Sequence, residues 1–167
     1  MWYYKNTPAW TDDTTEAASG GGTAFTILAA STDYMYFGFH EMFNKIQFTL
    51  GQNGSYGTLT WGYSKGAGNL GTVTVTDGTS KFSQNGSVTL TPPADWAIDT
   101  VNSFANMFWL RVSAANVTTQ AKCLQAIINP CFFCVLQNPK YTESPDIWDY
   151  TLYELTLPQV ENPNANW

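Results

Sequence analysis

Polar and apolar residues alternate along several short stretches of the chain, as they do in strands that bury one face. The stretch Lys45–Leu50 (KIQFTL) places its apolar residues on one side and its polar residues on the other. Ser87–Thr91 alternates in the same way, with Val88 and Leu90 on the apolar side. Both stretches predict strands of a sheet with one face toward a core.

Other stretches are apolar on both faces. Met107–Val112 (MFWLRV) is almost continuously apolar, with Arg111 its only charge, which predicts a strand buried on both sides. Asp33–Phe39 also carries large apolar or aromatic residues at alternate positions of both faces. In Tyr56–Tyr63, apolarity favours Leu59 and Trp61 as the inward residues, with Tyr56, Thr58 and Thr60 as the alternative set.

Turn residues separate these stretches. Asn53-Gly54, Asp77-Gly78 and Asn85-Gly86 are typical of tight turns, because Asn, Asp and Gly tolerate positive φ. Pro92 and Pro93 cannot donate to a ladder and must end the strand before them. About eight to ten short strands at this spacing predict an all-β fold, an antiparallel β-sandwich similar to a jelly roll, with helix at most marginal.

The chain begins with an extended aromatic arm, which contains Trp2, Tyr3, Tyr4 and Trp10. Thr11–Gly22 is polar and ends in three glycines, so it predicts a flexible loop or linker. We therefore expect an arm and linker over residues 1–22, a sandwich over 23–157 and a polar tail over 158–167. The arm is predicted to be an assembly interface on a neighbouring subunit; packing against its own sheet is the alternative.

Toward the C-terminus the strand signals continue. Ala121–Leu136 is apolar and β-prone around Asn129-Pro130, which predicts two strands at a proline bend. Ser113–Thr119 is polar and predicts a turn. Ile147–Leu157 alternates with apolar residues on both faces and predicts the closing strand.

Composition limits the partners that the chain can bind. Of 167 residues, 12% are charged and 16% aromatic, so the rings either fill an aromatic-rich core or cover a partner surface. The seven Lys and Arg are scattered in a chain of net charge -6, which argues against nucleic acid. No stretch reaches the length of about 20 apolar residues that spans a membrane, and the first residues lack a signal peptide. We expect a protein made in a cytoplasm.

The cysteines invite a metal hypothesis. Cys131-x-x-Cys134 has the spacing of a zinc knuckle, but only Cys123 and the single His40 are available as further ligands. Buried, inert cysteines are the favoured interpretation, with an internal disulfide and a metal site as alternatives. No metal and no cofactor is predicted.

Catalytic and cofactor motifs find little support. His40 would have to carry any triad, and no nucleophile motif accompanies it. Gly66, Gly68 and Gly71 match the spacing of a dinucleotide-binding loop, but no helix follows them. Paired carboxylates occur as Asp12-Asp13 and as Asp95 with Asp99, without a context that assigns them a role. The sequence therefore predicts a protein that is not an enzyme.

Four short patterns together resemble a known group of domains: Asp77-Gly78-Thr79, Gly86-Ser87-Val88, Pro92-Pro93-x-Asp95-Trp96 and Phe108-Trp109-x-Arg111-Val112. Over about Thr11–Ala114 the chain is similar to small β-sandwich domains in structural proteins of tailed phages and archaeal viruses. The resemblance implies a virion protein whose partners are the major capsid protein or other virion subunits, and a homo-oligomer. Small size, low charge, the cysteine-rich segment and the arm favour a capsid decoration protein over a tail or baseplate component.

A carbohydrate-binding sandwich is the main alternative function. Exposed tryptophans stack on sugar rings, and Trp61 and Trp148 are the candidate platform for a host glycan. Trp96 follows the Pro-Pro corner and is expected to plug that corner of the sandwich instead.

Overall fold

The computed structural model describes the backbone of residues 2–6 and 10–130, and the side chains of residues 10–130 except 105. A seven-stranded sheet contains β1 (Trp2–Asn6), β2 (Trp10–Asp12), β4 (Tyr34–Phe39), β7 (Leu59–Ser64), β8 (Leu70–Thr72), β11 (Asp99–Val101) and β12 (Phe104–Ala114). A five-stranded sheet contains β3 (Phe25–Thr26), β5 (Phe43–Gln52), β9 (Val75–Asp77), β10 (Gly86–Leu90) and β14 (Lys122–Pro130). β6 (Ser55–Tyr56) pairs with β13 (Val117–Thr119), and α1 spans Thr14–Ala18.

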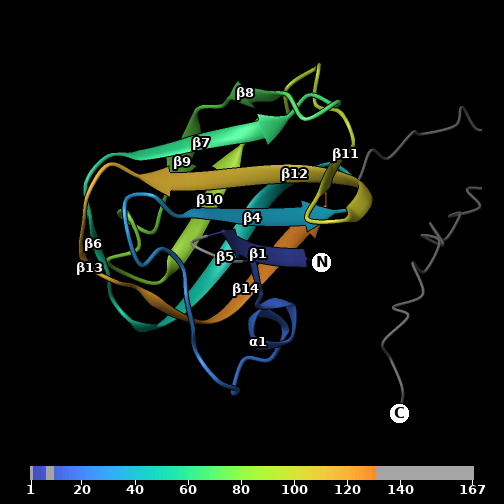
Figure 1. The fold of residues 1–167 in the computed structure, drawn as a ribbon. Coiled ribbons are helices and arrows are strands. Elements are labelled where there is room, and N and C mark those ends of the chain that lie inside the picture. The colour runs from blue at the N-terminus through green and yellow to red at the C-terminus, as the bar shows by residue number, and fades with distance from the viewer. Residues whose placement is uncertain (1, 7–9, 131–167) are drawn as a thin grey trace, which may run out of the picture. The chain divides into compact units, whose positions relative to one another are not determined.

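The two large sheets form the layers of a sandwich. The order in the first is β2-β1-β4-β12-β7-β8, with β11 beside β12, and the order in the second is β3-β14-β5-β10-β9. In Figure 1, β7, β12, β4 and β1 form one layer, and β10, β5 and β14 cross behind it. All pairs between these strands are antiparallel. The predicted all-β antiparallel sandwich is confirmed, whereas its likeness to a jelly roll stays a prediction.

The alternation in the sequence correctly predicts which residues face the core. Ile46 and Phe48 of β5 are buried and pair with Val88 and Gly86 of β10, and Gln47 between them is exposed. In β7 Trp61 is buried and Thr60 exposed, as the favoured set predicts, whereas Tyr56 of the alternative set is also buried, in β6. Period-two burial on facing sheets is what closes a sandwich core.

Much of the aromatic content fills that core. Phe82 is fully buried, and its ring centroid lies 5.1 Å from that of Phe48, 5.9 Å from Tyr56 and 6.3 Å from Trp61. The Phe48 and Tyr56 contacts are edge-to-face, the geometry that aromatic quadrupoles favour. The aromatic-rich core is therefore present, and it accounts for part of the unusual composition.

A left-handed turn carries Phe82 into this cluster. Ser80, Lys81 and Phe82 have φ of 49°, 61° and 59°, and each such residue costs about 1–2 kcal/mol relative to the right-handed form. The Asp77 carboxylate compensates, because its oxygens accept hydrogen bonds from the backbone N–H groups of Thr79 and Lys81, both at 2.8 Å. Complete burial of the Phe82 ring contributes about 1.5–3 kcal/mol in the same direction.

The predicted arm and linker belong to the sandwich, so its expected start at Thr23 is wrong. β1 lies between β2 and β4, with Tyr4 paired to Tyr36 on one side and to Asp12 on the other. The expected loop Thr11–Gly22 contains the end of β2 and the short helix α1, whose Ala17 is fully buried. The prediction of a separate arm considered only the flexible linker. It did not consider that β4 has an edge whose backbone groups need a strand partner, which β1 supplies.

The segment after β12 also departs from expectation. Ser113–Thr119, predicted as a turn, contains the end of β12 and the strand β13. The first strand predicted in Ala121–Leu136 is present as β14, which runs without a break to Pro130. Cys131, Cys134, Trp148, the predicted closing strand Ile147–Leu157 and the tail 158–167 lie outside the described residues. Within the part that the structure describes, no helix has the length and apolarity needed to span a membrane.

Candidate functional site: an aromatic face of the seven-stranded sheet

The outward face of the seven-stranded sheet carries half-buried aromatic residues at its centre. Met35 and Phe37 of β4 are fully buried in the core, so Tyr34 and Tyr36, which alternate with them, face outward. Arg111 of β12 pairs directly with Tyr36. We call Trp10, Tyr34, Tyr36 and Arg111 the aromatic face.

Trp10 extends this surface onto β2. Its ring centroid lies 5.4 Å from that of Tyr36 at an interplanar angle of 49°, and its side chain is 37% exposed. The intervening strand β1 pairs Trp2 with Gly38, Tyr3 with Phe37 and Tyr4 with Tyr36. Of the residues predicted to form an assembly interface, Trp2 and Tyr4 are paired with outward positions of β4. Tyr3 is paired with Phe37, which is a core residue.

Arg111 is the cation of the aromatic face. Its guanidinium carbon lies 4.6 Å from the centroid of the Tyr34 ring, within the range of a cation–π contact. On the β7 side its pairing partner is Gly62, which has no side chain to cover it. Among the described residues, ion pairs join His40 to Glu41 and Lys65 to Asp95, and Arg111 has no carboxylate partner.

One end of the outward face is closed by the protein itself. The Trp109 ring lies over Gly38, where a Cβ atom would stand 2.4 Å from the ring. The indole Nε1–H of Trp109 donates to the Asp99 carbonyl at 3.1 Å, so β11 covers the ring. Trp109 is consequently buried and fills this part of the face, whereas Trp10 is exposed and Tyr36 and Arg111 are half-buried.

The five-stranded sheet presents a different outward face. Its outward positions on β5 and β10 are Lys45, Gln47, Thr49, Ser87 and Thr89. A shallow groove of about 240 Å³ runs beside its edge strand and is lined by Thr74, Val75, Thr76, Thr89, Leu90 and Thr91. None of these outward positions, and none of the residues that line the groove, is aromatic. The aromatic surface is thus a property of one sheet only.

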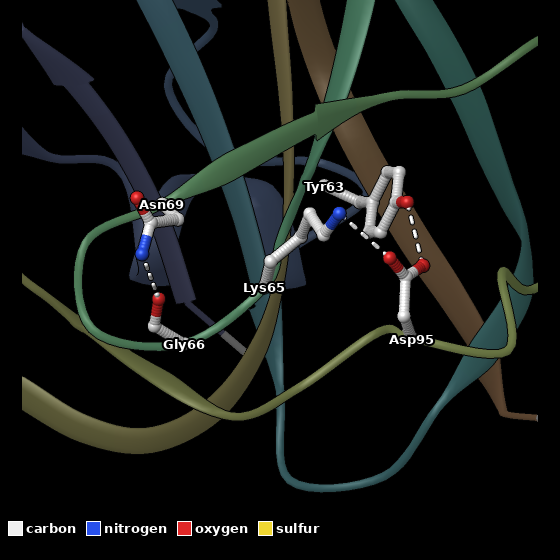
Figure 2. Close-up of polar contacts among 5 residues, drawn as sticks. All are labelled: Tyr63, Lys65, Gly66, Asn69 and Asp95. Carbon is white, nitrogen blue, oxygen red and sulfur yellow. Dashed lines mark hydrogen bonds and ion pairs between the residues drawn. The ribbon is translucent and has the colours of Figure 1, made fainter.

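A polar cluster fixes the Pro-Pro corner to β7 (Figure 2). The Tyr63 hydroxyl donates to Asp95 Oδ1 at 2.7 Å, and Lys65 Nζ lies 2.8 Å from Asp95 Oδ2. The hydrogen bond to Asp95 raises the pKa of Tyr63, and the same carboxylate raises the pKa of Lys65. Lys65 and Tyr63 in turn lower the pKa of Asp95. Each group is held more firmly in its ordinary protonation state, which suits a structural contact and not proton transfer.

The glycine-rich loop beside this cluster is a hairpin connection. Lys65 N–H donates to the Asn69 carbonyl at 2.9 Å, and Gly66 and Gly68 have φ of +80° and +76°. The Gly68 N–H donates to the Asp99 carboxylate at 2.9 Å, so the protein's own anion occupies that donor. The antiparallel strand β8 follows the loop, and the βαβ unit of a dinucleotide site is therefore not formed here.

The tryptophans predicted from sequence have different outcomes. Trp96 is 3% exposed, and its ring contacts Phe43 at a centroid distance of 5.0 Å, which confirms the predicted corner plug. Trp61 is 4% exposed and lies between Phe37 and Phe82, so its prediction as a glycan platform is wrong. The alternation of β7 turns Trp61 inward, and a ring in the core cannot stack on a sugar.

The remaining candidates do not assemble into a chemical site. His40 is exposed beside Glu41 and the ring of Phe39. Cys123 is buried, its thiol lies 3.0 Å from the Gln125 carbonyl as a donor, and burial raises its pKa to about 12. Within residues 10–130, no three His, Cys, Asp or Glu side chains gather as a metal would require.

The sequence pattern alone does not predict that Tyr34, Tyr36 and Arg111 form a joint surface. Two signals were available: Asp33–Phe39 is apolar on both faces, and Arg111 interrupts an apolar strand. These residues meet only because β12 pairs with β4, an arrangement of strands that are distant in sequence. Periodicity along one strand does not reveal which strand lies beside it.

The chain is thus an all-β sandwich with an accessible aromatic surface on its seven-stranded sheet. No protein-family model matches it, and no curated protein has a significant sequence match to it.

Proposed function

We propose that this chain is a non-enzymatic structural protein of a virus particle, a capsid decoration or accessory protein that binds the capsid shell through the aromatic face. The proposed partners are the major capsid protein or other virion subunits, together with further copies of this chain. Nucleic acid and membranes are not among the proposed partners. The proposed location is the virion, after synthesis in the host cytoplasm.

The aromatic face is the observation that carries this proposal. Trp, Tyr and Arg are enriched among the residues that contribute most to binding energy between proteins. Here Trp10, Tyr34, Tyr36 and Arg111 lie together on one sheet face, and the other sheet has none of these residue types at the outward positions of β5 and β10. A shell that presents many copies of a site multiplies weak contacts of this kind.

The virion setting rests on the sequence resemblance. Its four patterns lie at described positions of the sandwich: Thr79 beside the left-handed turn, Val88 in the core, Trp96 at the corner, and Arg111 on the aromatic face. The patterns thus mark places where this fold has specific requirements.

The test uses particles from the native source. Cryo-electron imaging of purified particles, combined with an antibody against this chain, is expected to locate it on the shell. Particles from which the chain has been removed should bind added wild-type protein again but should not bind the Trp10→Ala or Tyr36→Ala variant. The Thr89→Ala variant, changed on the other sheet, should bind as the wild type does. Absence of the chain from purified particles contradicts the proposal, and a position on the tail favours the tail or baseplate alternative.

A carbohydrate-binding sandwich remains the second candidate. Trp61 no longer supports it, and Trp148 lies outside the described residues, but the partly exposed Trp10 ring beside Tyr36 offers another surface on which a sugar could stack. A glycan array probed with the wild-type protein and with Trp10→Ala tests this candidate. Binding to a defined glycan that is lost in Trp10→Ala favours it over attachment to a shell.

A further inference from the structure

The strongest unexplained group on the described surface is the Arg111 guanidinium. The side chain is half-buried at the centre of the seven-stranded sheet. The contact described for it is with the Tyr34 ring, whose centroid lies 4.6 Å from the guanidinium carbon. The ion pairs of the described residues do not include it. A guanidinium has five N–H donors, and a ring face satisfies none of them as a hydrogen-bond acceptor would.

Arg111 is only half-buried, and one of its two neighbours in the sheet has no side chain. In the β7 direction the guanidinium lies over Gly62, because a Cβ added there would be in van der Waals contact with Nε and Nη2 of Arg111, at 3.9 Å. Its neighbour in the β4 direction is Tyr36, which contacts Trp10. The cation therefore lies over a glycine on one side and beside a pair of aromatic rings on the other.

Within residues 10–130, the chain supplies the rings and the cation of this surface, and no described carboxylate forms an ion pair with Arg111. The net charge of the chain is -6, so an acidic partner would be repelled elsewhere on the molecule. Arginine binds carboxylates with two parallel hydrogen bonds, and such bonds are stronger when water is excluded by flanking rings. Arg111 is therefore suited to select an acidic group and to orient it.

We infer that the protein partner of the aromatic face places a carboxylate, from an Asp or Glu side chain set among apolar residues, on the guanidinium of Arg111. This inference rests on the proposed function and names the chemistry of the partner's surface. A protein is favoured over an acidic sugar because the Trp10 and Tyr36 rings are tilted by 49° against each other. The surface also joins Trp, Tyr and Arg, the residue types that contribute most to binding energy between proteins.

The first experiment measures binding of small probes to the full chain by NMR. Phenylacetate combines a ring with a carboxylate, phenylacetamide is its neutral counterpart, and glucuronate is an acidic sugar. The signals of the Arg111 Nε–H and the Trp10 indole N–H are followed during each titration. We expect phenylacetate to shift both signals and to bind about 10-fold more tightly than phenylacetamide, the difference typical of a charge-assisted hydrogen-bonded pair.

Two variants establish that the guanidinium causes this preference. Arg111→Gln should bind phenylacetate and phenylacetamide equally, and Arg111→Lys should keep only part of the preference because it keeps the charge but loses the two-point geometry. Thr89→Ala, on the other sheet, should behave as the wild type. Unchanged amide dispersion in the spectra of each variant shows that the fold is intact.

The outcomes separate this inference from the proposed function. Equal affinity for phenylacetate and phenylacetamide, or a preference that survives Arg111→Gln, overturns the inference. Binding of glucuronate without binding of phenylacetate overturns the assignment to a protein carboxylate. With either of these two outcomes, the rebinding experiment on particles still tests the Trp10→Ala variant. Failure of that variant to bind particles would support attachment through the aromatic face without the Arg111 contact.

Discussion

Neighbouring residues of β4 show two uses of aromatic side chains in one molecule. Phe37 is fully buried and contacts Phe48 of the opposite sheet, while Tyr36, the preceding residue, faces outward and contacts Trp10. Inside the sandwich, rings contribute to stability through burial; outside, they leave apolar surface accessible to a partner. High aromatic content by itself therefore does not distinguish a large core from a binding surface.

The largest effect is expected for a ring inside the sandwich. Trp96→Ala should lower the free energy of unfolding by about 3 to 5 kcal/mol, because it removes a buried ring that packs against Phe43, Tyr63 and Phe108. Equilibrium denaturation measures the loss. A loss below about 1 kcal/mol would mean that the corner is not part of the core.

The next test removes β1, the strand that lies between β2 and β4 in the seven-stranded sheet. Deletion of residues 1–10 takes β1 away from β4 and should cost about 2 to 4 kcal/mol, from about 1 kcal/mol for each of a few lost strand hydrogen bonds. The unfolding midpoint should fall accordingly. An unchanged midpoint, with assembly lost, would restore the initial prediction of an arm that serves only a neighbouring subunit.

A smaller loss of stability is expected for a change at Gly38, which lies under the Trp109 ring. Gly38→Ala should cost about 1 to 3 kcal/mol, because the new Cβ would stand 2.4 Å from the Trp109 ring and force it to move. Gly21→Ala is the matched control, since nothing lies within 4 Å of its added Cβ. Equal stability of the two variants would show that Trp109 does not lie closely over Gly38.

On the outer surface, stability and binding should separate. Trp10→Ala is expected to lower the free energy of unfolding by only about 0.5 to 1.5 kcal/mol, the range for one exposed aromatic pair, while attachment to particles is lost. Calorimetry and particle binding are measured on the same sample. A loss as large as that of Trp96→Ala would place Trp10 among the core residues.

The smallest effect concerns the polar corner and depends on pH. The lowered pKa of Asp95 gives a stabilising contribution that is present above its unfolded value, near 3.8, and is lost as the pH falls through the folded value. The raised pKa values of Tyr63 and Lys65 give contributions that are lost as the pH rises through their folded values. The stability difference between the wild type and Asp95→Asn should therefore be constant near neutral pH and shrink at both extremes. A difference that is independent of pH would exclude the ion pair as its cause.

Local patterns in the sequence predict the strands and the direction of their side chains. Alternation identifies the buried residues of β5 and β10, and Pro92 identifies the place where the chain leaves the sheet after Leu90. These features depend on neighbours in sequence, which is why one strand at a time is enough to find them.

Features that depend on pairing between distant strands were not predicted. The role of β1 follows from the open edge of β4, and the aromatic face follows from the register of Tyr36 with Arg111. The left-handed turn before Phe82 was also missed, because Ser80 and Lys81 are not residues that favour positive φ and only the Asp77 carboxylate explains their conformation.

The pairing of β5 with β14 has a consequence for how the chain is made. The Cys123 thiol of β14 contacts the Thr49 carbonyl of β5, 74 residues away in sequence. During synthesis β5 emerges first and meets β10, and one of its edges stays open until β14 has left the ribosome. Contacts of such long sequence separation slow folding and prolong the exposure of apolar strands to other nascent chains. Yield of soluble protein should therefore rise when translation or growth temperature is lowered, because fewer half-made chains are present at once.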